Sequence, residues 1–283
     1  MQDGRYVIRG MMPAEIGLAV DWAASEGWNP GLHDAECYAE ADPHGFLIGV
    51  LDGEPVATIS AIRYGASFGF LGFYIVRPEF RGNGYGMQIW DAGIKHLAGR
   101  NIGLDGVVAQ QDNYRKSGFE LAYRNVRFEG TGGGSMPKTR ELVPLSSLPF
   151  EAVETYERPF FPARRSAFVR AWIQQPDGHA LGILGNETLR GYGVIRPCGS
   201  GFKIGPLFAD TPDLAEVLFR ALKSRAGPSD PVFLDTPEMN EAAVRMAQGH
   251  GMRVVFETAR MYSGESPDLP LSRVFGVTSF EVG

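Results

Sequence analysis

The second half of this 283-residue chain repeats the first half at a constant shift of 133 positions. The shift places Gly178 under Gly45, and it holds through a predicted hairpin, through the strand that follows and to the end of a later helix. Chance can match a glycine at one position, but not at one shift across several elements. The sequence therefore predicts a duplication, in which two copies of one unit follow each other. The other matched pairs are Gly49 with Gly182, Leu51 with Leu184, Glu54 with Glu187, Ile62 with Ile195, Arg63 with Arg196, Gly72 with Gly205 and Gly118 with Gly251.

The length of the chain agrees with two domains. With 44% hydrophobic residues, 283 positions can bury two cores of ordinary size. The glycine run that begins at Gly130 and ends at Ser135 is the best linker in the sequence. We expect a first domain over residues 1–130, a linker over 131–139 and a second domain over 140–283.

Each copy is predicted to be a mixed, mostly antiparallel sheet flanked by helices, an α/β fold of the α+β kind. Asp52-Gly53 predicts a tight turn between two strands, because these residues adopt the positive φ angles that such a turn needs. Apolar residues at spacings of three, four and three predict one face of a helix, made of Met87, Trp90, Ile94 and Leu97. In the first copy we expect strands over 6–9, 46–51, 56–62, 68–76, 102–104 and 119–128, and helices over 13–26, 34–40, 84–98 and 107–117.

Charge and cysteine content limit the partners. The 27 Lys and Arg residues against 33 Asp and Glu give a net charge of -6, so no general basic field exists to hold nucleic acid or an anionic membrane surface. Neither a signal sequence nor a membrane span is expected, because no long apolar run occurs. Cys37 and Cys198 form no C-x-x-C pair, which is typical of a reducing compartment and predicts no metal site. We expect a cytoplasmic protein with a small-molecule partner.

The segment from Arg77 to Gly86 carries the chemistry. It lies between a predicted strand and a predicted amphipathic helix. A glycine-rich turn at a helix N-terminus is an anion cradle, because the first backbone N–H groups lack carbonyl partners and the helix dipole is positive there. The glycine spacing does not fit the dinucleotide fingerprint, and no lysine follows Gly86 as a nucleoside-triphosphate loop requires. Asp105, which imitates the acidic residue of a dinucleotide fold, is therefore read as structural.

The spacing Arg-x-x-Gly-x-Gly, made by Arg81, Gly84 and Gly86, resembles the pyrophosphate loop of the GCN5-related N-acetyltransferase (GNAT) family. The strand-to-loop segment 73–82 looks like the first signature of that family, and 113–119, with a tyrosine four residues before Gly-Phe, is similar to the second. The resemblance covers most of residues 1–130 and, more weakly, 140–262. It implies a strand that splays from its neighbour and exposes backbone groups to the pantetheine arm of acetyl-CoA.

By this resemblance the cofactor is acetyl-CoA, and an acceptor amine attacks its thioester directly in a ternary complex. Tyr114 is the candidate general acid for the departing thiolate, although it could instead be an aromatic residue that packs on its helix. An N–H from the strand 73–76 would stabilise the oxyanion. The residues expected to bind the cofactor are Ile75, Val76, Arg81, Gly82, Asn83, Gly84, Tyr85, Gly86, Met87 and Asn113.

The acceptor is expected to be a small primary amine, bound between the loop after the first helix and the C-terminal half. An aromatic face with nearby carboxylates suits an ammonium group, because cation–π attraction and charge pairing both select positive charge. The alternative is that Trp28 only packs under the loop and the acids are solvated. The general base is open between Asp34, Glu36 and His33 acting through water. The expected acceptor residues are Trp28, Asn29, His33, Asp34 and Glu36.

The second copy is predicted not to catalyse. The constant shift puts Leu214, Val217 and Phe219 in place of Arg81, Gly84 and Gly86, and it puts Ala247 at the tyrosine position. Two other function classes stay open: a noncatalytic regulator that binds acyl-CoA, and an acetyltransferase for protein N-termini. The sequence leaves the oligomeric state open, with a homodimer among the options.

Overall fold

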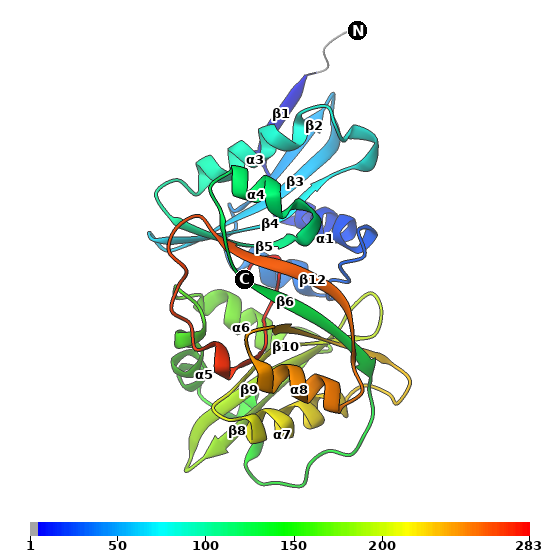
Figure 1. The fold of residues 1–283 in the computed structure, drawn as a ribbon, viewed down its shortest axis with the longest axis vertical. Coiled ribbons are helices and arrows are strands. Elements are labelled where there is room, and N and C mark those ends of the chain that lie inside the picture. Colours follow the sequence, from blue (N-terminus) through cyan, green and yellow to red (C-terminus); the bar gives the residue numbers. More distant parts are fainter. Residues whose placement is uncertain (1–4) are drawn as a thin grey trace.

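The computed structural model describes residues 5–283 and shows one continuous 13-stranded sheet that runs through both halves of the chain (Figure 1). The predicted fold class is confirmed: the sheet is mixed and mostly antiparallel, with helices packed on it. The first half contains β1 (Tyr6–Gly10), α1 (Ile16–Ser25), α2 (Asp34–Ala39), β2 (Phe46–Leu51), β3 (Glu54–Tyr64), β4 (Phe68–Val76), α3 (Tyr85–His96), β5 (Asn101–Val107), α4 (Gln111–Lys116) and β6 (Glu120–Thr131).

The second half repeats this order, as the shift of 133 predicts. The hairpin strands β8 and β9, the next strand β10 and the long strand β12 lie where the shift places the counterparts of β2, β3, β4 and β6. The loop before α7 is shorter than the shift assumes. The elements are β7 (Leu142–Pro144), α5 (Phe150–Glu157), α6 (Ser166–Gln174), β8 (His179–Gly185), β9 (Thr188–Pro197), β10 (Phe202–Ala209), α7 (Pro212–Lys223), β11 (Pro231–Pro237), α8 (Glu241–Gly249), β12 (Arg253–Tyr262) and β13 (Val274–Gly276).

The two halves exchange their last long strands. The order of the sheet is β4-β5-β12-β6-β11-β10, so β12 of the second half lies beside β5 of the first, and β6 of the first half lies beside β11 of the second. Tyr262 pairs with Gly103, and Thr131 pairs with Pro231. Figure 1 shows β6 and β12 crossing the middle of the molecule together. The boundaries at 130 and 140 stay a prediction, since the sheet continues across them.

Local sequence explains the elements around the site. Asp52 and Gly53 both have positive φ angles, 49° and 90°, as the predicted turn requires. The predicted apolar face buries Trp90 in α3 and Leu97 at its C-cap, but Met87 in the first turn is 61% exposed. Cys37 and Cys198 are free and buried. None of the helices in residues 5–283 has the length and apolarity needed to cross a membrane.

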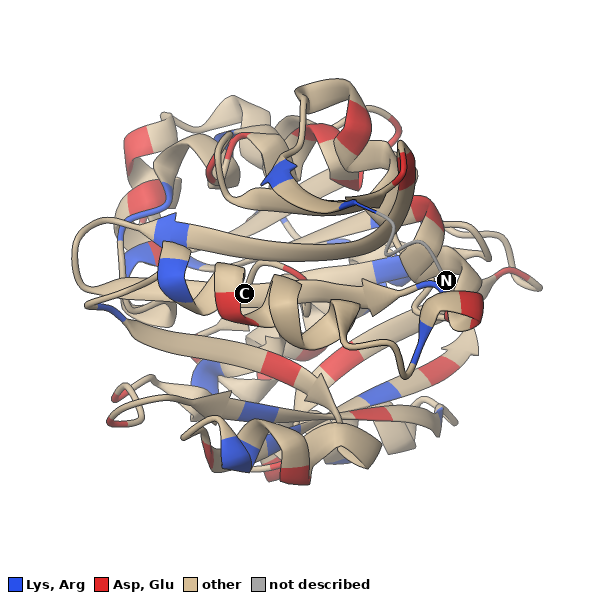
Figure 2. Ribbon diagram, turned by 90° about the horizontal axis from the view of Figure 1, so that it is seen from above, with Lys and Arg blue, Asp and Glu red and all other residues tan. Residues whose placement is uncertain are grey.

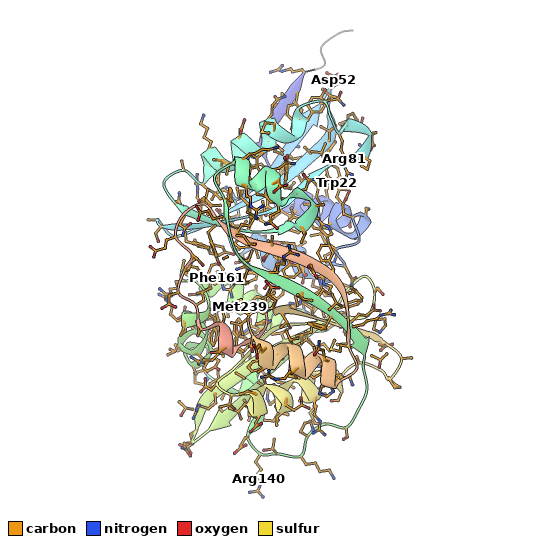
Figure 3. All side chains as sticks on the ribbon, in the orientation of Figure 1. Trp22, Asp52, Arg81, Arg140, Phe161 and Met239 are labelled. Carbon is orange, nitrogen blue, oxygen red and sulfur yellow. The ribbon has the colours of Figure 1, made fainter. Side chains whose placement is uncertain are left out.

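Aromatic side chains join the two halves. Phe161 of the second half, labelled in Figure 3, lies near the middle of the molecule. Its ring contacts those of Tyr64 and Phe68 of the first half, with centroids 4.7 Å and 5.4 Å apart. The C-terminus also lies between the halves, where the Tyr64 hydroxyl donates to the Val282 carbonyl at 2.7 Å. Acidic and basic residues are interspersed over the ribbon in Figure 2. The core therefore continues from one half into the other.

Candidate active site

The strands β4 and β5 separate halfway along their length. They pair in parallel only from Phe68 with Asn101 to Leu71 with Leu104. Beyond this point Gly72–Val76 and Asp105–Val107 line opposite walls of a cavity of about 650 Å³. The predicted splay is therefore present, and it leaves one edge of β4 without a neighbouring strand.

A bulge in β4 lies at the start of this gap. Opposite β3, the pairing shifts between Ser60 with Gly72 and Thr58 with Ile75. Phe73 has a φ of 45°, a left-handed conformation that is rare for a bulky residue, and the Thr58 hydroxyl donates to its carbonyl at 2.9 Å. The bulge turns the backbone of β4 at the point where its free edge begins.

The loop from Arg77 to Gly84 leads from β4 into α3 at the mouth of the cavity. Gly82 and Gly84 have φ angles of 81° and 83°, and no atom outside their chain neighbours lies within 4 Å of the position of a Cβ on either. The Arg81 guanidinium donates to the Val76 carbonyl at 2.8 Å and pairs with Glu26 of the segment after α1. Open backbone at the N-terminus of a twelve-residue helix suits a phosphate group.

Most of the predicted cofactor residues line the cavity. The exceptions are Asn83, which is exposed and donates to the Phe80 and Arg81 carbonyls, and Tyr85, whose ring packs against Tyr6 at 4.7 Å. A Cβ on Gly86 would lie 2.8 Å from the Tyr74 hydroxyl, so a glycine is needed there for packing. The predicted residues that line the cavity are Ile75, Val76, Arg81, Gly82, Gly84, Gly86, Met87 and Asn113.

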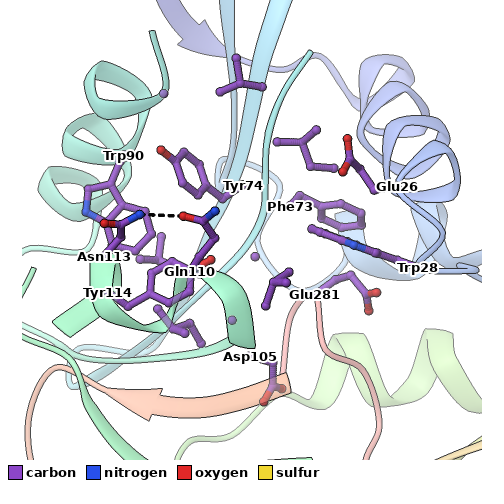
Figure 4. A pocket seen from close by; sticks show the side chains of 18 of the residues that line it. Glu26, Trp28, Phe73, Tyr74, Trp90, Asp105, Gln110, Asn113, Tyr114 and Glu281 are labelled. Atoms are coloured by element: carbon purple, nitrogen blue, oxygen red, sulfur yellow. Dashed lines mark hydrogen bonds between the residues drawn. The ribbon is translucent and has the colours of Figure 1, made fainter. Parts of the chain in front are cut away.

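Tyr114 lines the cavity from α4, opposite Trp28 (Figure 4). Its ring packs against Trp90, with centroids 5.5 Å apart, so the packing role and the functional role coexist. Burial raises the pKa of Tyr114 to about 12, and the nearby Tyr74 adds to this shift. A phenol with a pKa this far above 7 carries its proton near neutral pH. Asn113, on the same short helix, donates to the Gln110 side chain at 2.7 Å.

The far end of the cavity is formed by the last residues of the chain, which the sequence analysis missed. Phe280 and Glu281 line it, and the Glu281 side chain lies between the walls carrying Tyr114 and Trp28 in Figure 4. Glu281 is 4% exposed. Its Oε2 accepts from the Ser279 hydroxyl at 2.7 Å and lies 3.1 Å from the Tyr38 hydroxyl. Within residues 5–283, its Oε1 accepts no hydrogen bond, and no cation pairs with it.

A second carboxylate at this end is already paired. Asp105 contacts Arg260 through both oxygens, at 2.8 Å and 2.5 Å, and accepts from Asn125 at 2.8 Å. The carboxylate of Asp105 is therefore used in a structural ion pair, as expected from the sequence, although the residue does line the cavity. Glu281 is the carboxylate that remains available.

Of the five predicted acceptor residues, only Trp28 lines the cavity. Its backbone is held by the second half, since its carbonyl accepts from Arg127 at 2.7 Å and from Lys203 at 3.4 Å. Asn29 points away and bonds to Cys198 and Ser200. The acceptor was expected between this loop and the second half, but at Trp28 and Asn29 the loop contacts the second half directly.

Asp34, His33 and Glu36 also lie outside the cavity, which corrects the expectation that one of them is the base. Asp34 is fully buried and contacts Arg196 through both oxygens, at 2.7 Å and 3.1 Å. His33 contacts Asp177 at 3.3 Å, and Glu36 is exposed. Asp34 and Arg196 thus form a buried ion pair that joins the two halves.

The corresponding loop in the second half is lost by deletion. Only Asp210 and Thr211 separate β10 from α7, where eight residues separate β4 from α3 in the first half. The assignment of Leu214, Val217 and Phe219 to the cradle positions was wrong, because α7 begins at Pro212 and all three lie inside it. The conclusion that the cradle is absent from this half stands, and Ala247 is buried in α8 at the tyrosine position.

Comparisons with known proteins agree with this architecture. A model described as the acetyltransferase (GNAT) family matches residues 17–119, and one described as an acetyltransferase (GNAT) domain matches 153–276. A holothin acyltransferase of Pseudoalteromonas sp. (strain SANK 73390) is 27% identical, over 95% of this chain and 92% of that protein.

Two solved structures share the fold. A putative acetyltransferase of Pyrococcus horikoshii superposes with a TM-score of 0.83 at 21% identity, covering 100% of this chain and 97% of that one. A tandem GNAT protein from the clavulanic acid biosynthesis pathway has a TM-score of 0.64 at 13% identity, covering 93% of this chain and 100% of that one.

Proposed function

The chain belongs to the GNAT family in its tandem form and is an acyltransferase, and from this premise we propose that it transfers acetyl from acetyl-CoA to a small primary amine. The observation that carries the proposal is that one cavity joins a phosphate cradle to a buried carboxylate. The open backbone of Gly82 and Gly84 lies at one end of this cavity, and Glu281 lies at the other end. The relative named for holothin supports a small-molecule acceptor.

The residues of the cavity fit acetyl-CoA by their chemistry. The cradle of Gly82 and Gly84 would hold the pyrophosphate, and the free edge of β4 would bind the pantetheine arm. The cofactor supplies the activated acetyl group. Ile75 and Val76 place the backbone of β4 along this path, and the Arg81 guanidinium, held by the Val76 carbonyl and by Glu26, lies at its mouth.

Glu281 is the general base of the proposed reaction. An ammonium group with a pKa near ~10 must lose a proton before its nitrogen can attack. The Oε1 of Glu281 is free for this proton, while Oε2 is fixed by Ser279. Trp28 lines the cavity and offers an aromatic face to a cationic acceptor, whereas the Phe280 ring already lies under the Arg127 guanidinium, 5.2 Å from its centroid. The nitrogen would attack the thioester carbonyl to give a tetrahedral oxyanion, which a backbone N–H of Phe73–Val76 would stabilise. Collapse of this oxyanion would break the C–S bond and release the thiolate, which Tyr114 would protonate.

Tyr114→Phe is expected to lower kcat by about 10²-fold while the Kd for acetyl-CoA stays similar. The phenol carries its proton because its pKa is raised to about 12, and it would give this proton to the departing thiolate. Phe keeps the packing on Trp90. Steady-state kinetics and calorimetry on the same preparations measure the two quantities. An unchanged kcat would return Tyr114 to a packing role alone.

Gly84→Val is expected to weaken acetyl-CoA binding at least tenfold, about 1.4 kcal/mol. A branched side chain fills the open cradle, and it is also strained at a φ of 83°. Gly99→Val is the matched control, since Gly99 has a φ of 80°, open space around it and a place at the other end of α3. Calorimetry should show weaker binding for Gly84→Val only. Equal affinities for the two folded variants would exclude this cradle.

The proposed function is tested by measuring thiol release from acetyl-CoA with a panel of primary amines, anionic acceptors and peptides with free N-termini. Turnover is expected with small primary amines. Binding of acetyl-CoA without turnover on any acceptor would instead indicate a regulator, and turnover confined to the peptides would indicate an N-terminal acetyltransferase. Because both cysteines are free and buried, a reducing compartment such as the cytoplasm is part of the proposal.

A further inference from the structure

The second half contains a gap between strands that corresponds to the cavity of the first. Strands β10 and β11 pair in parallel only from Phe202 with Val232 to Ile204 with Leu234. The pairing of β10 with β9 then shifts between Ile204 and Leu207, as that of β4 with β3 shifts around Phe73. Gly205, at the start of this gap, is the repeat partner of Gly72. The two halves thus share the splay, although only the first half has a cradle.

The chain itself fills the gap in the second half. Strand β13 pairs antiparallel with β10, with Leu207 opposite Gly276. On the other wall, the Thr236 hydroxyl of β11 donates to the Phe275 carbonyl at 3.0 Å. The side chain of Asn240, just before α8, donates to the Val274 carbonyl at 2.9 Å. Residues 274–276 therefore lie along the free edge of β10, in the same relation that a ligand on the free edge of β4 would have.

The segment then runs from the gap of the second half to that of the first. The Val277 carbonyl lies so close to Gly205 that a Cβ there would collide with it, and the Glu281 carbonyl lies in the same way against Gly72. The Ser60 hydroxyl donates to the Glu281 carbonyl at 3.0 Å. The two matched glycines thus contact the same segment four residues apart, and its end reaches the far end of the active cavity.

We propose that residues 274–277 occupy the vestigial donor cleft of the second half, and that this anchoring holds Glu281 at the acceptor end of the active cavity. The inference rests on the proposed function. It makes Thr236 and Asn240 positioning residues, because they hold the segment and do not line the cavity. In this proposal the second half no longer binds a cofactor. Its cleft instead binds the segment that places the Glu281 side chain in the cavity of the first half.

The full chain with Thr236→Val and Asn240→Asp tests this role. Both changes remove a donor to the segment, while Asp keeps the helix cap that Asn240 gives to Ala243. We expect kcat with the best amine to fall by about tenfold or more, because a displacement of ~1 Å at a reacting group can cost about 10²-fold. The Kd for acetyl-CoA should change by less than about twofold, which is well under 1.4 kcal/mol.

Thr236→Ser is the matched control, since it keeps the hydroxyl, and it should retain the kcat of the unaltered chain. Hydrogen exchange should be faster in residues 274–282 of the double variant. A double variant in which kcat is unchanged, or in which kcat and cofactor affinity fall together, would overturn the positioning role.

A second experiment exchanges the segment in the folded protein. A protease site placed in the exposed stretch 263–266 allows the chain to be cut after it has folded. The released segment is then exchanged for a synthetic peptide of residues 267–283, which should keep amine turnover. Exchange for the same peptide with Glu281→Gln should abolish turnover and leave cofactor binding.

Equal turnover with the two peptides would overturn the inference. If the unaltered chain acetylates no amine, it is the proposed function that fails. Hydrogen exchange then still tests whether Thr236 and Asn240 anchor the segment, because residues 274–282 should exchange faster in the double variant.

Discussion

Glu281→Gln is expected to lower kcat for amine acetylation by about 10²- to 10³-fold, within the range of a lost general base. The amide keeps an oxygen that can accept from Ser279, so the segment stays anchored, but it cannot take up a proton. The Kd for acetyl-CoA should not change, because the cradle lies at the other end of the cavity. Stopped-assay kinetics at saturating cofactor, with calorimetry for the Kd, measure both.

Glu36→Gln is the control for this prediction. It makes the same chemical change at an exposed residue outside the cavity, and it tests a base that the sequence had suggested. We expect the kinetics of the unaltered chain. If Glu36→Gln loses activity and Glu281→Gln does not, the base has been assigned to the wrong carboxylate.

Asp34→Ala is expected to destabilise the fold by about 3–5 kcal/mol, because it leaves Arg196 as an uncompensated buried charge. Asp34 is 0% and Arg196 1% exposed. The change also removes the acceptor of the Gly31 N–H at 2.8 Å and a partner of the Tyr38 hydroxyl. Urea denaturation gives the free energy of unfolding.

Glu241→Ala removes the partner of Arg245 in an exposed pair, and it serves as the control. Its side chains are 81% and 68% exposed, and the change should cost less than about 1 kcal/mol. Equal losses for the two variants would mean that the Asp34–Arg196 pair is not important for the stability of the fold.

The loss caused by Asp34→Ala should also depend on pH. Burial acts to raise the pKa of Asp34, but the charge of Arg196 outweighs it, so the net pKa is lowered. A carboxyl whose pKa is lowered by folding stabilises the protein above its ordinary pKa, and this contribution is lost as the pH falls through the lowered value. The difference in unfolding free energy between Asp34→Ala and the unaltered chain should therefore shrink in acid.

The cradle could be predicted from the sequence because it is local. Arg81, Gly84 and Gly86 lie within six positions, and the helix that follows shows its own periodicity. Tyr114 was found for the same reason, from its spacing to Gly118. A binding site made of neighbouring residues at one helix end can be predicted from a single stretch of sequence.

The acceptor end could not be predicted, because it is assembled from distant segments. Glu281 lies beyond the last repeated strand, so the shift gives it no counterpart. Asp34 resembled a site residue because its partner, Arg196, is 162 positions away. The constant shift also failed before α7, since a deletion in a loop leaves the neighbouring strands in register.

The exchange of β6 and β12 constrains how the protein can be made. The free edge of β5 receives its partner only when residues 253–262 have left the ribosome, so the first half waits with an unpaired strand through most of the synthesis of the second. A message cut short after the glycine run yields a cradle but neither the neighbouring strand nor the carboxylate. With Glu281 as the proposed base, premature termination anywhere between the glycine run and Glu281 leaves no active enzyme, which makes the codons of this stretch as intolerant of nonsense mutations as those of the cradle.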